Sequence, residues 1–355
     1  MIFVVGGGPA GLATAYELQR RGLPYQVLER HSVGYTWQNH YDRLHLHTLK
    51  EVSGLPGLPM PDDYPAFASA MQLHAYLQSY AKHFQLNVAE GVDVQRANYV
   101  DRRWQLETNN GTLSSDTLIV ATGIWNNPYC PKLPGTETFG GTIMHSNDYR
   151  NAKPFEGQRV LVVGAGNSGT EIAVDLSEHG ATAGIAIRNG STFVPYPRSV
   201  AAVKTAAWVL RNVPRPVGER LLASVRRDFR HIGIHLPAEP LMDAYPVVGF
   251  ELPEAVEAGK VTVYGDIAQL VPGGVRFADG HEAQFDSIIM ATGYRSTVQF
   301  VAHELDFDNA GRPKVDRYWR STRNPSLICV GLHYPTTEGW LQKIGRVVHT
   351  AVKAL

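Results

Sequence analysis

The sequence is poor in cysteine, carries no excess of charge of either sign and contains no long hydrophobic run. Its two cysteines, Cys130 and Cys329, lie 199 positions apart, which excludes a CxxC dithiol or a zinc ribbon built on cysteine pairs and fits a reducing compartment. The 33 Lys+Arg residues balance 33 Asp+Glu residues, so the net charge does not favour capture of nucleic acid or of an anionic membrane. No stretch approaches the ~18 apolar residues of a membrane span, and no signal-type segment is visible at the start. We therefore expect a cytoplasmic protein with no integral membrane segment and no nucleic-acid partner.

The length and composition are those of a globular protein with two domains. The chain has 355 residues, of which 44% are hydrophobic and 19% charged. Such a chain can bury sizeable cores, and it is too long for one ordinary domain of ~100–200 residues. We therefore expect two domains.

The first 30 residues read as a strand, a glycine turn, a helix and a second strand. An apolar strand over 2–5 leads into Gly6-Gly7-Gly8-Pro9-Ala10-Gly11, and a helical pattern over 12–21 ends at Gly22. A GxGxxG turn of this kind brings backbone amides and the positive end of a helix dipole to a pyrophosphate. Glu29 ends the second strand, 18 residues after Gly11, where a carboxylate accepts hydrogen bonds from a ribose hydroxyl. The segment predicts a dinucleotide-binding βαβ unit.

The same pattern recurs 158 residues later. An apolar strand over 159–163 leads into Gly164-Ala165-Gly166-Asn167-Ser168-Gly169, and a helical pattern and a second strand over 183–187 follow. In each half a β meander then precedes a buried strand that ends in Ala-Thr-Gly, at Ala121-Thr122-Gly123 and at Ala291-Thr292-Gly293. Small residues at a strand end permit close approach of a ligand or a domain crossover. The halves are internally duplicated, and the duplication implies two bound dinucleotides.

The residues that end each second strand distinguish the two sites. Glu29-Arg30 in the first unit suits an unphosphorylated ribose, as in FAD or NAD, whereas Arg188 in the second unit can clamp a 2′-phosphate. The second site is therefore expected to take NADPH. The alternative is that Arg188 is simply a solvated charge at the end of a strand.

Between the two glycine turns, Phe139, Gly141, His145 and Tyr149 match the pattern FxGxxxHxxx(Y/F). With two flanking GxGxxG turns, the whole chain resembles the class B flavin-containing monooxygenases. It is most similar to short bacterial sulfide-oxidising members, which accept NADH or NADPH, and to plant YUCCA-type enzymes. His145 itself is expected to order the crossover between domains through backbone hydrogen bonds, not to act as a general base.

The resemblance and the duplication together imply an α/β fold with two Rossmann-like domains, arranged as in glutathione reductase. Residues 1–150 and 294–355 are expected to form the FAD-binding domain. Residues 151–293 are expected to form the inserted NAD(P)H-binding domain, with a helical insertion at about 196–253. The apolar positions and arginines of that insertion fit helices packed on the domain, which we favour, or a substrate lid or membrane-surface helix.

The family's active-site segment, Asn-x-x-Lys-Glu, corresponds here to His47-Thr48-Leu49-Lys50-Glu51. His47 takes the Asn position, so the resemblance implies a catalytic role for it as a polar group near flavin N5. His40, His45 and His47 with Asp42 could instead hold a metal ion or be structural, but no further ligand completes a metal pattern, and we expect no metal. The residues expected to bind the cofactors are Gly6, Gly8, Pro9, Ala10, Gly11, Glu29, Arg30, Trp37, Gln38, His45, Leu46, Val94, Ala121, Thr122, Gly123, Gly164, Gly166, Asn167, Ser168, Gly169, Glu171, Arg188, Ala291, Thr292 and Gly293.

The resemblance implies that NADPH reduces FAD, that a flavin C(4a)-hydroperoxide forms with O₂, and that a soft nucleophile such as a thioether takes one oxygen atom. The expected cofactors are FAD and NADPH. NADH is expected to be accepted too, because Asn189-Gly190 follows Arg188 where the family has Ser or Thr. The expected partners are a small-molecule substrate and O₂. Whether the protein forms a homodimer is left open by the sequence. The alternatives are an NAD(P)H oxidase or flavin reductase, a YUCCA-like decarboxylation of indole-3-pyruvate, and a flavoprotein redox sensor.

Overall fold

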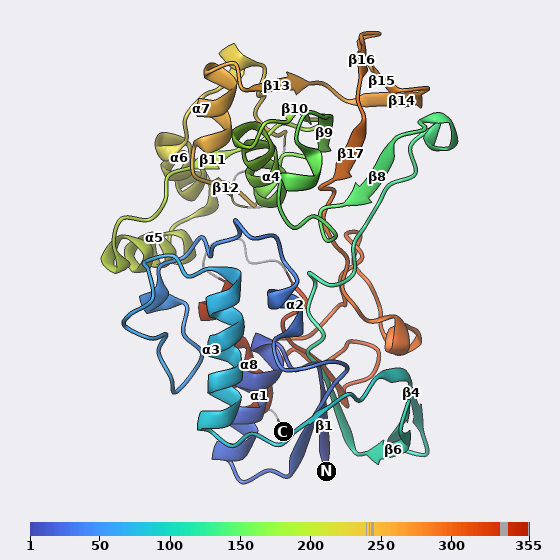
Figure 1. The fold of residues 1–355 in the computed structure, drawn as a ribbon. Coiled ribbons are helices and arrows are strands. Elements are labelled where there is room, and N and C mark those ends of the chain that lie inside the picture. The colour runs from blue at the N-terminus through green and yellow to red at the C-terminus, as the bar shows by residue number, and fades with distance from the viewer. Residues whose placement is uncertain (239, 241, 243–244, 334–339, 354) are drawn as a thin grey trace. The chain divides into compact units, whose positions relative to one another are not determined.

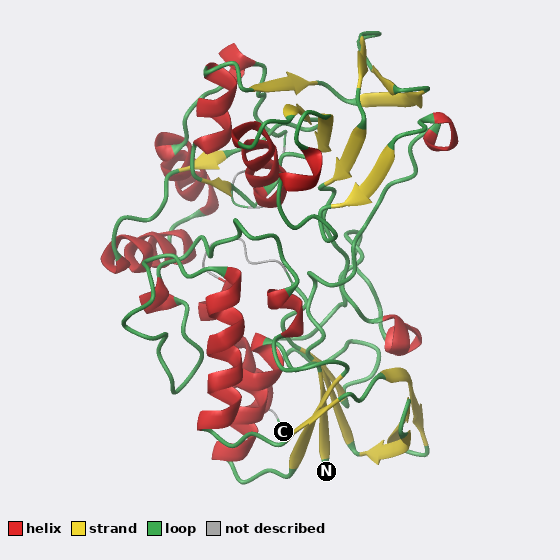
Figure 2. Ribbon diagram, viewed as in Figure 1, coloured by secondary structure: helices red, strands yellow, loops and turns green. Residues whose placement is uncertain are grey.

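Two parallel β-sheets, each with helices packed against it, organise the chain (Figure 1 and Figure 2). The structure is a computed structural model and describes residues 1–238, 240, 242, 245–333, 340–353 and 355. By its internal contacts the chain divides into unit 1, formed by Met1–Asn39, Thr48–Asn127 and Tyr294–Leu355, and unit 2, formed by His40–His47 and Pro128–Gly293. The predicted α/β fold with two Rossmann-like sheets is confirmed.

Unit 1 has a five-stranded parallel sheet in the order β18-β7-β1-β2-β3. Figure 1 shows its helices α1, α3 and α8 grouped beside β1. A separate antiparallel sheet, β4-β5-β6, is the predicted first meander. The strands and helices of unit 1 are β1 (Ile2–Val5), α1 (Pro9–Arg20), β2 (Tyr25–Glu29), α2 (Tyr35–Gln38), α3 (Ala70–His83), β3 (Val88–Glu90), β4 (Val94–Val100), β5 (Arg103–Thr108), β6 (Gly111–Ser115), β7 (Thr117–Val120), β18 (Leu327–Cys329) and α8 (Trp340–Lys353), with 3₁₀ helices at Lys50–Val52 and Gln299–Glu304.

The first strand and helix form where the sequence predicted them, with one shift. Parallel strands are covered on both faces, which explains why β1 is a continuous apolar run with a fully buried Val4. Helix α1 begins at Pro9, three residues before the apolar pattern suggested, with Gly8 as its N-cap. Proline fits the first helical position because its missing N–H would have no partner there. The glycine turn therefore runs directly into the helix.

Unit 2 repeats this plan with the sheet order β13-β10-β9-β17-β8. The second meander, β14-β15-β16, is again antiparallel. The strands and helices of unit 2 are β8 (Thr142–His145), β9 (Arg159–Val163), α4 (Asn167–Glu178), β10 (Thr182–Ala186), β11 (Phe193–Val194), α5 (Val200–Asn212), α6 (Arg215–Val225), β12 (Val247–Val248), α7 (Glu251–Glu257), β13 (Val261–Tyr264), β14 (Ile267–Val271), β15 (Gly274–Phe277), β16 (Glu282–Gln284) and β17 (Ser287–Met290), with 3₁₀ helices at Thr136–Thr138, Lys153–Phe155 and Arg230–Ile232.

The two sheets differ in the origin of their fifth strand. In unit 1 the strand beside β7 is β18, from the end of the chain, whereas in unit 2 the strand beside β17 is β8, which precedes its glycine turn. Residues 128–150, assigned to the first domain from the sequence, therefore contribute a strand to the second sheet. Residues 40–47 likewise belong to unit 2, although the chain on both sides of them belongs to unit 1.

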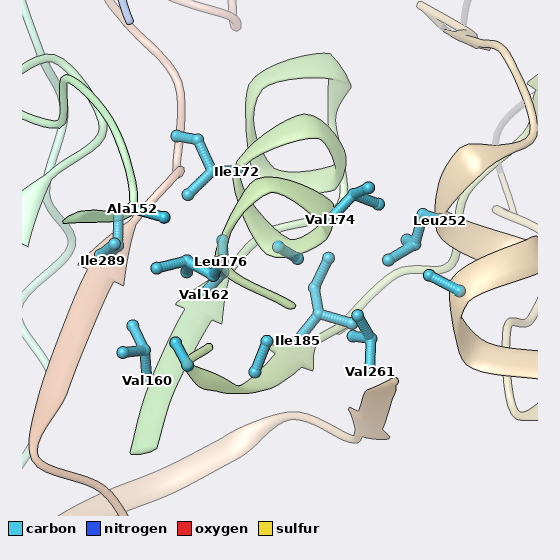
Figure 3. Close-up of a cluster of buried hydrophobic side chains, with 14 of the residues drawn as sticks. Ala152, Val160, Val162, Ile172, Val174, Leu176, Ile185, Leu252, Val261 and Ile289 are labelled. Atoms are coloured by element: carbon cyan, nitrogen blue, oxygen red, sulfur yellow. The ribbon is translucent and has the colours of Figure 1, made fainter. Parts of the chain in front are cut away.

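Each parallel sheet has an apolar core on one of its faces. In unit 2 Val160, Val162 and Ile185 of the strands meet Ile172 and Leu176 of α4, and all five are fully buried (Figure 3). In unit 1 a second cluster packs the strands of the parallel sheet against the meander, with Leu118 and Val120 of β7 meeting Trp104 of β5. Burial of each such side chain stabilises the fold by roughly 1.5–3 kcal/mol, so these cores hold the glycine turns in place.

The insertion expected at 196–253 contains helices α5 and α6. Ala207 is buried, but Trp208, Val217 and Leu221 are exposed, with Trp208 61% exposed. Positions 239, 241, 243 and 244 of the insertion lie outside the described residues. Among the described residues, no helix has both the length and the apolar character needed to cross a membrane.

Candidate functional site

The first glycine turn leaves one open position, at Gly8. A Cβ built on Gly6 would lie 2.6 Å from the carbonyl oxygen of Ala121, and one on Gly11 would lie 1.8 Å from that of Gly6. Packing within the protein therefore requires glycine at both positions. A Cβ on Gly8, in contrast, would meet no heavy atom within 4 Å among the described residues. The structure thus leaves space at the N-terminus of α1, as expected for the approach of a pyrophosphate.

Glu29 connects the end of β2 to this turn. Its Oε2 accepts a hydrogen bond from the Gly7 N–H at 2.6 Å, and its Oε1 accepts one from the His31 N–H at 2.8 Å. A carboxylate has about four acceptor sites, so acceptor capacity remains for a ribose hydroxyl. The neighbouring Arg30 is bonded to the His31 ring at 3.1 Å. Glu29 therefore orders the glycine turn, and its carboxylate lies beside the turn with acceptor sites to spare.

The other residues predicted to bind FAD are distributed over both units. Trp37 on α2 is buried and lies edge-on to Trp125, with Gln38 beside it, and the buried Val94 begins β4. After β7, the Thr122 hydroxyl donates to the carbonyl oxygen of Thr297 at 2.5 Å. His45 and Leu46 belong to unit 2, where His45 Nδ1 bonds the carbonyl oxygen of Arg43 at 2.7 Å.

The second glycine turn repeats the first in detail. A Cβ on Gly164 would lie 2.5 Å from the Ala291 carbonyl oxygen, and one on Gly169 would lie 1.9 Å from that of Gly164. A Cβ on Gly166 would again meet nothing within 4 Å among the described residues. The side chain of Asn167 is engaged, because its Oδ1 accepts from the Val248 N–H at 3.0 Å. The open space is therefore at Gly166, at the N-terminus of α4.

Arg188 follows β10 at the edge of this second turn. It is exposed, and within the described part of the chain its guanidinium makes no hydrogen bond or ion pair. The nearby Ser191 hydroxyl is bonded to the Ala165 carbonyl oxygen, and the Ser191 N–H donates to the His235 carbonyl oxygen at 2.9 Å. Arg188 is thus a free cation on an ordered loop, whereas the Ser191 hydroxyl is already engaged.

The Ala-Thr-Gly segment of unit 2 meets His145. His145 Nδ1 accepts the Asn147 N–H at 3.0 Å, so Nε2 carries the proton and donates to the Gly293 carbonyl oxygen at 3.1 Å. Burial lowers the pKa of His145, which keeps the ring neutral. The Tyr129 N–H also donates to the Gly293 carbonyl oxygen, and the Thr292 hydroxyl donates to that of Tyr129. Both ring nitrogens of His145 bond the backbone, as predicted from the sequence.

His47 lies against helix α4 of unit 2. Its Nε2 is 2.6 Å from Oε1 of Glu171, and the Tyr41 hydroxyl donates to Glu171 Oε2 at 2.9 Å. The ring of Tyr196 lies edge-on to His47, with centroids 6.4 Å apart. Burial and the charges of Glu251 and Glu171 raise the pKa of Tyr196, so its hydroxyl stays protonated. The structure therefore brings together two predicted site residues, His47 and Glu171.

Tyr41 and Tyr196 were not predicted from the sequence as neighbours of His47. Tyr41 and Glu171 are 130 positions apart in the sequence, and no local sequence pattern predicts their contact. His40, His45, His47 and Asp42, weighed above as an alternative metal site, do not form one in the structure: among the described residues no group of three or more His, Cys, Asp or Glu side chains is placed to hold a metal ion.

Comparison with known proteins finds flavoenzymes similar to this chain in sequence and fold. The family model described as pyridine nucleotide-disulphide oxidoreductase matches residues 3–207. The chain is 37% identical over 313 residues to indole-3-pyruvate monooxygenase YUCCA1 of Oryza sativa subsp. japonica, covering 83% of this chain and 77% of that protein. It is 36% identical over 331 residues to the probable indole-3-pyruvate monooxygenase YUCCA1 of Arabidopsis thaliana, covering 88% and 80%. A solved flavin-containing monooxygenase from Stenotrophomonas maltophilia is 26% identical and superposes with a TM-score of 0.77 over 99% of this chain and 98% of that one.

Proposed function

Because this chain belongs to the class B flavin monooxygenases, within the pyridine nucleotide-disulphide oxidoreductase family, we propose that it oxygenates a soft nucleophile such as a thioether. The reaction consumes thioether, O₂, NADPH and a proton and yields sulfoxide, NADP⁺ and water. The observation that carries the proposal is the pair of glycine turns, 6–11 and 164–169, each of which we call a glycine cradle. Among the described residues, the space at Gly8 in the first cradle and at Gly166 in the second is open. Each cradle fits one dinucleotide, as an enzyme that passes a hydride from a nicotinamide to a flavin requires.

Unit 1 holds FAD in this proposal. Gly8 and the amides that open α1 would hold its pyrophosphate, and Glu29 would accept hydrogen bonds from its ribose hydroxyls. FAD, when bound, supplies the redox chemistry, accepting a hydride and activating O₂. The protein contributes orientation, electrostatics and exclusion of water. The two free cysteines support this division, since Cys130 is exposed and Cys329 is buried with no cysteine next to it in the sequence to form a dithiol.

Unit 2 holds the nicotinamide cofactor. Gly166 would hold its pyrophosphate, and Arg188, which has no partner among the described residues, would bind the 2′-phosphate of NADPH. NADH binds as well, because Arg188 is the principal contact that distinguishes the two cofactors and Asn189-Gly190 adds no hydroxyl there. Ser191 adds none either, because its hydroxyl is bonded to Ala165.

His47 is the proposed catalytic residue. Its Nε2 is held by Glu171, which leaves Nδ1 without a partner among the described residues and available to a reacting group. Its proposed task is to hold the oxygen-transferring centre and the nicotinamide amide in place, not to move a proton. His47→Leu should still bind FAD and be reduced by NADPH, but should release more peroxide and less oxygenated product per NADPH.

A second candidate is oxidative decarboxylation of an aromatic α-keto acid such as indole-3-pyruvate. The 32–37% identity to proteins named indole-3-pyruvate monooxygenases favours it. This reaction consumes the keto acid, O₂, NADPH and a proton and yields the shortened carboxylic acid, CO₂, NADP⁺ and water. It uses the same two dinucleotide sites and differs only in the nucleophile and its pocket.

One assay separates these activities. The FAD-loaded protein is supplied with NADPH and O₂ and either methyl phenyl sulfide or indole-3-pyruvate, and NADPH loss, peroxide and product are measured together. Sulfoxide equal to most of the NADPH consumed supports the first candidate, and indole-3-acetate with CO₂ supports the second. Peroxide equal to NADPH consumption with both substrates would contradict both and identify an oxidase.

A further inference from the structure

Helix α4 carries three carboxylates on one face that bond the segment 40–47 and its neighbour Tyr149. Glu171, Asp175 and Glu178 are four and three residues apart, a spacing that places their side chains on the same side of a helix. Asp175 accepts the Tyr149 hydroxyl at 2.5 Å, and Glu178 pairs with Arg43. Because α4 begins at the glycine cradle of unit 2, this acidic face is part of the same rigid element as the nicotinamide site.

Glu171 makes the most specific of these contacts. One carboxylate oxygen bonds His47 at 2.6 Å and the other bonds Tyr41 at 2.9 Å, so a single side chain fixes both ends of the segment 41–47. The side chains of Glu171 and His47 are only 18% and 19% exposed. Hydrogen bonds to an ionised, partly buried carboxylate are stronger than bonds between neutral groups.

We propose that Glu171 is a positioning residue that anchors the segment 40–47 to helix α4 and sets the orientation of His47, and that it makes no contact with the cofactor. The sequence alone placed Glu171 among the cofactor ligands. The hydrogen bonds seen on both of its oxygens run to this segment, and the Kd for NADP⁺ tests whether its remaining acceptor sites reach the cofactor. The proposal rests on the function proposed for His47, and its experiments keep the two separable.

The main-chain contacts of the segment support an anchoring role. The Asp42 N–H donates to the Arg150 carbonyl oxygen at 2.8 Å, and Asn151 donates to the Asp42 carboxylate at 2.8 Å. These bonds hold the segment at Asp42, near its start, and do not touch His47. Loss of Glu171 would therefore release the end that carries His47 while Asp42 stays attached. The ring of His47 would then depend on its edge contact with Tyr196 for its orientation.

The first test measures local opening by hydrogen exchange followed by mass spectrometry on the whole FAD-loaded protein. In Glu171→Ala the amides of 44–48 should exchange several-fold faster than in the wild type, and Glu171→Gln should lie between the two. The matched control is Glu257→Ala, which removes the carboxylate of another His–Glu pair of unit 2, His231–Glu257 at 3.1 Å. It should leave exchange at 44–48 unchanged. Unaltered exchange in Glu171→Ala would overturn the anchoring role whether or not the protein is a monooxygenase.

The second test asks whether Glu171 acts through His47. Peroxide released per NADPH consumed and the Kd for NADP⁺ are measured for Glu171→Gln, His47→Leu and the double variant. Each single variant should raise the peroxide fraction at least threefold. The double variant should match His47→Leu, because both changes disrupt the same His47–Glu171 hydrogen bond and their effects therefore do not add. The Kd for NADP⁺ should change less than twofold in Glu171→Gln. A tenfold weaker Kd, equally large in the His47→Leu background, would show instead that Glu171 touches the cofactor.

Discussion

Glu29 and Gly7 are joined by a 2.6 Å hydrogen bond in which the carboxylate at the end of β2 accepts the N–H in the middle of the glycine turn. The residue expected to bind a ribose therefore also fixes the backbone expected to bind a pyrophosphate. This coupling makes the first cradle sensitive to a single side chain.

Glu29→Ala should weaken FAD binding by more than the loss of one ligand contact. The change removes acceptors for the Gly7 and His31 N–H groups as well as for the ribose, and hydrogen bonds to charged groups contribute about 1.5–3 kcal/mol each. The protein should purify largely without flavin, as measured by absorbance at 450 nm against protein concentration. The control is Glu90→Ala, which removes one acceptor, for the Val33 N–H, from neighbouring strand β3. Full flavin content in Glu29→Ala would refute the assignment.

Gly8→Ala and Gly11→Ala should fail in different ways. Alanine at Gly8 meets no described atom, so Gly8→Ala should fold with an unchanged Tm but retain little FAD, because its Cβ occupies the pyrophosphate space. Alanine at Gly11 would clash with the backbone oxygen of Gly6, so Gly11→Ala should be insoluble or have a markedly lower Tm. Circular dichroism melts and flavin content distinguish the two. A Gly8→Ala protein with full flavin would show that the open space is not the binding site.

Arg188→Ala should discriminate between the two nicotinamide cofactors. Loss of a charge-assisted bond to the 2′-phosphate should weaken NADPH by about 1.5–3 kcal/mol, or roughly 10- to 150-fold, and leave NADH within about twofold. Stopped-flow reduction at varied cofactor concentration gives both constants. Arg230→Ala serves as control, because Arg230 is an exposed cation of unit 2 already paired with Asp228. Equal losses for NADPH and NADH in Arg188→Ala would assign Arg188 to the fold.

Stability should fall as the pH drops below about 6.5. Burial, reinforced by the positive charge of Arg150, lowers the pKa of His40 to about 4, whereas an unfolded histidine titrates near 6.5. Between these values the unfolded chain binds a proton that the folded chain does not. The stabilisation is therefore complete above pH 6.5 and is lost towards pH 4, by about 2 kcal/mol after allowance for partial exposure. Urea unfolding at pH 7 and pH 5 should show a smaller difference for His40→Gln than for the wild type, and equal differences would contradict the shift.

The two thiols should react at very different rates. Cys130 is exposed, whereas Cys329 is fully buried in β18, and burial raises the pKa of its thiol to about 12. Ellman's reagent at pH 8 should titrate one thiol in the native protein and two in guanidinium. Cys130→Ser should abolish the native reaction. Two reactive thiols in the native protein would show that β18 opens readily.

Local sequence by itself determined the repeated strand, glycine turn and helix of each unit, because these features depend on contacts within about 30 residues. Gly6, Gly11, Gly164 and Gly169 could be predicted from the spacing alone, since steric exclusion of a Cβ allows glycine only at such positions. Glu29 was predicted in the same way as the strand-end acid of a βαβ unit. Its bond to Gly7 follows from the parallel pairing of β1 and β2.

Only the tertiary structure decided which unit each connecting segment joins. Strand β8 pairs with β17, and the segment 40–47 bonds α4 through contacts that span more than 120 positions. Periodicity and turn motifs describe residues that are neighbours along the chain. Pairing of distant segments costs loop-closure entropy, which is offset only by the contacts of the completed fold, so local patterns do not predict such pairings. For that reason the sequence could nominate both His47 and Glu171, but only the folded chain showed that they bond each other.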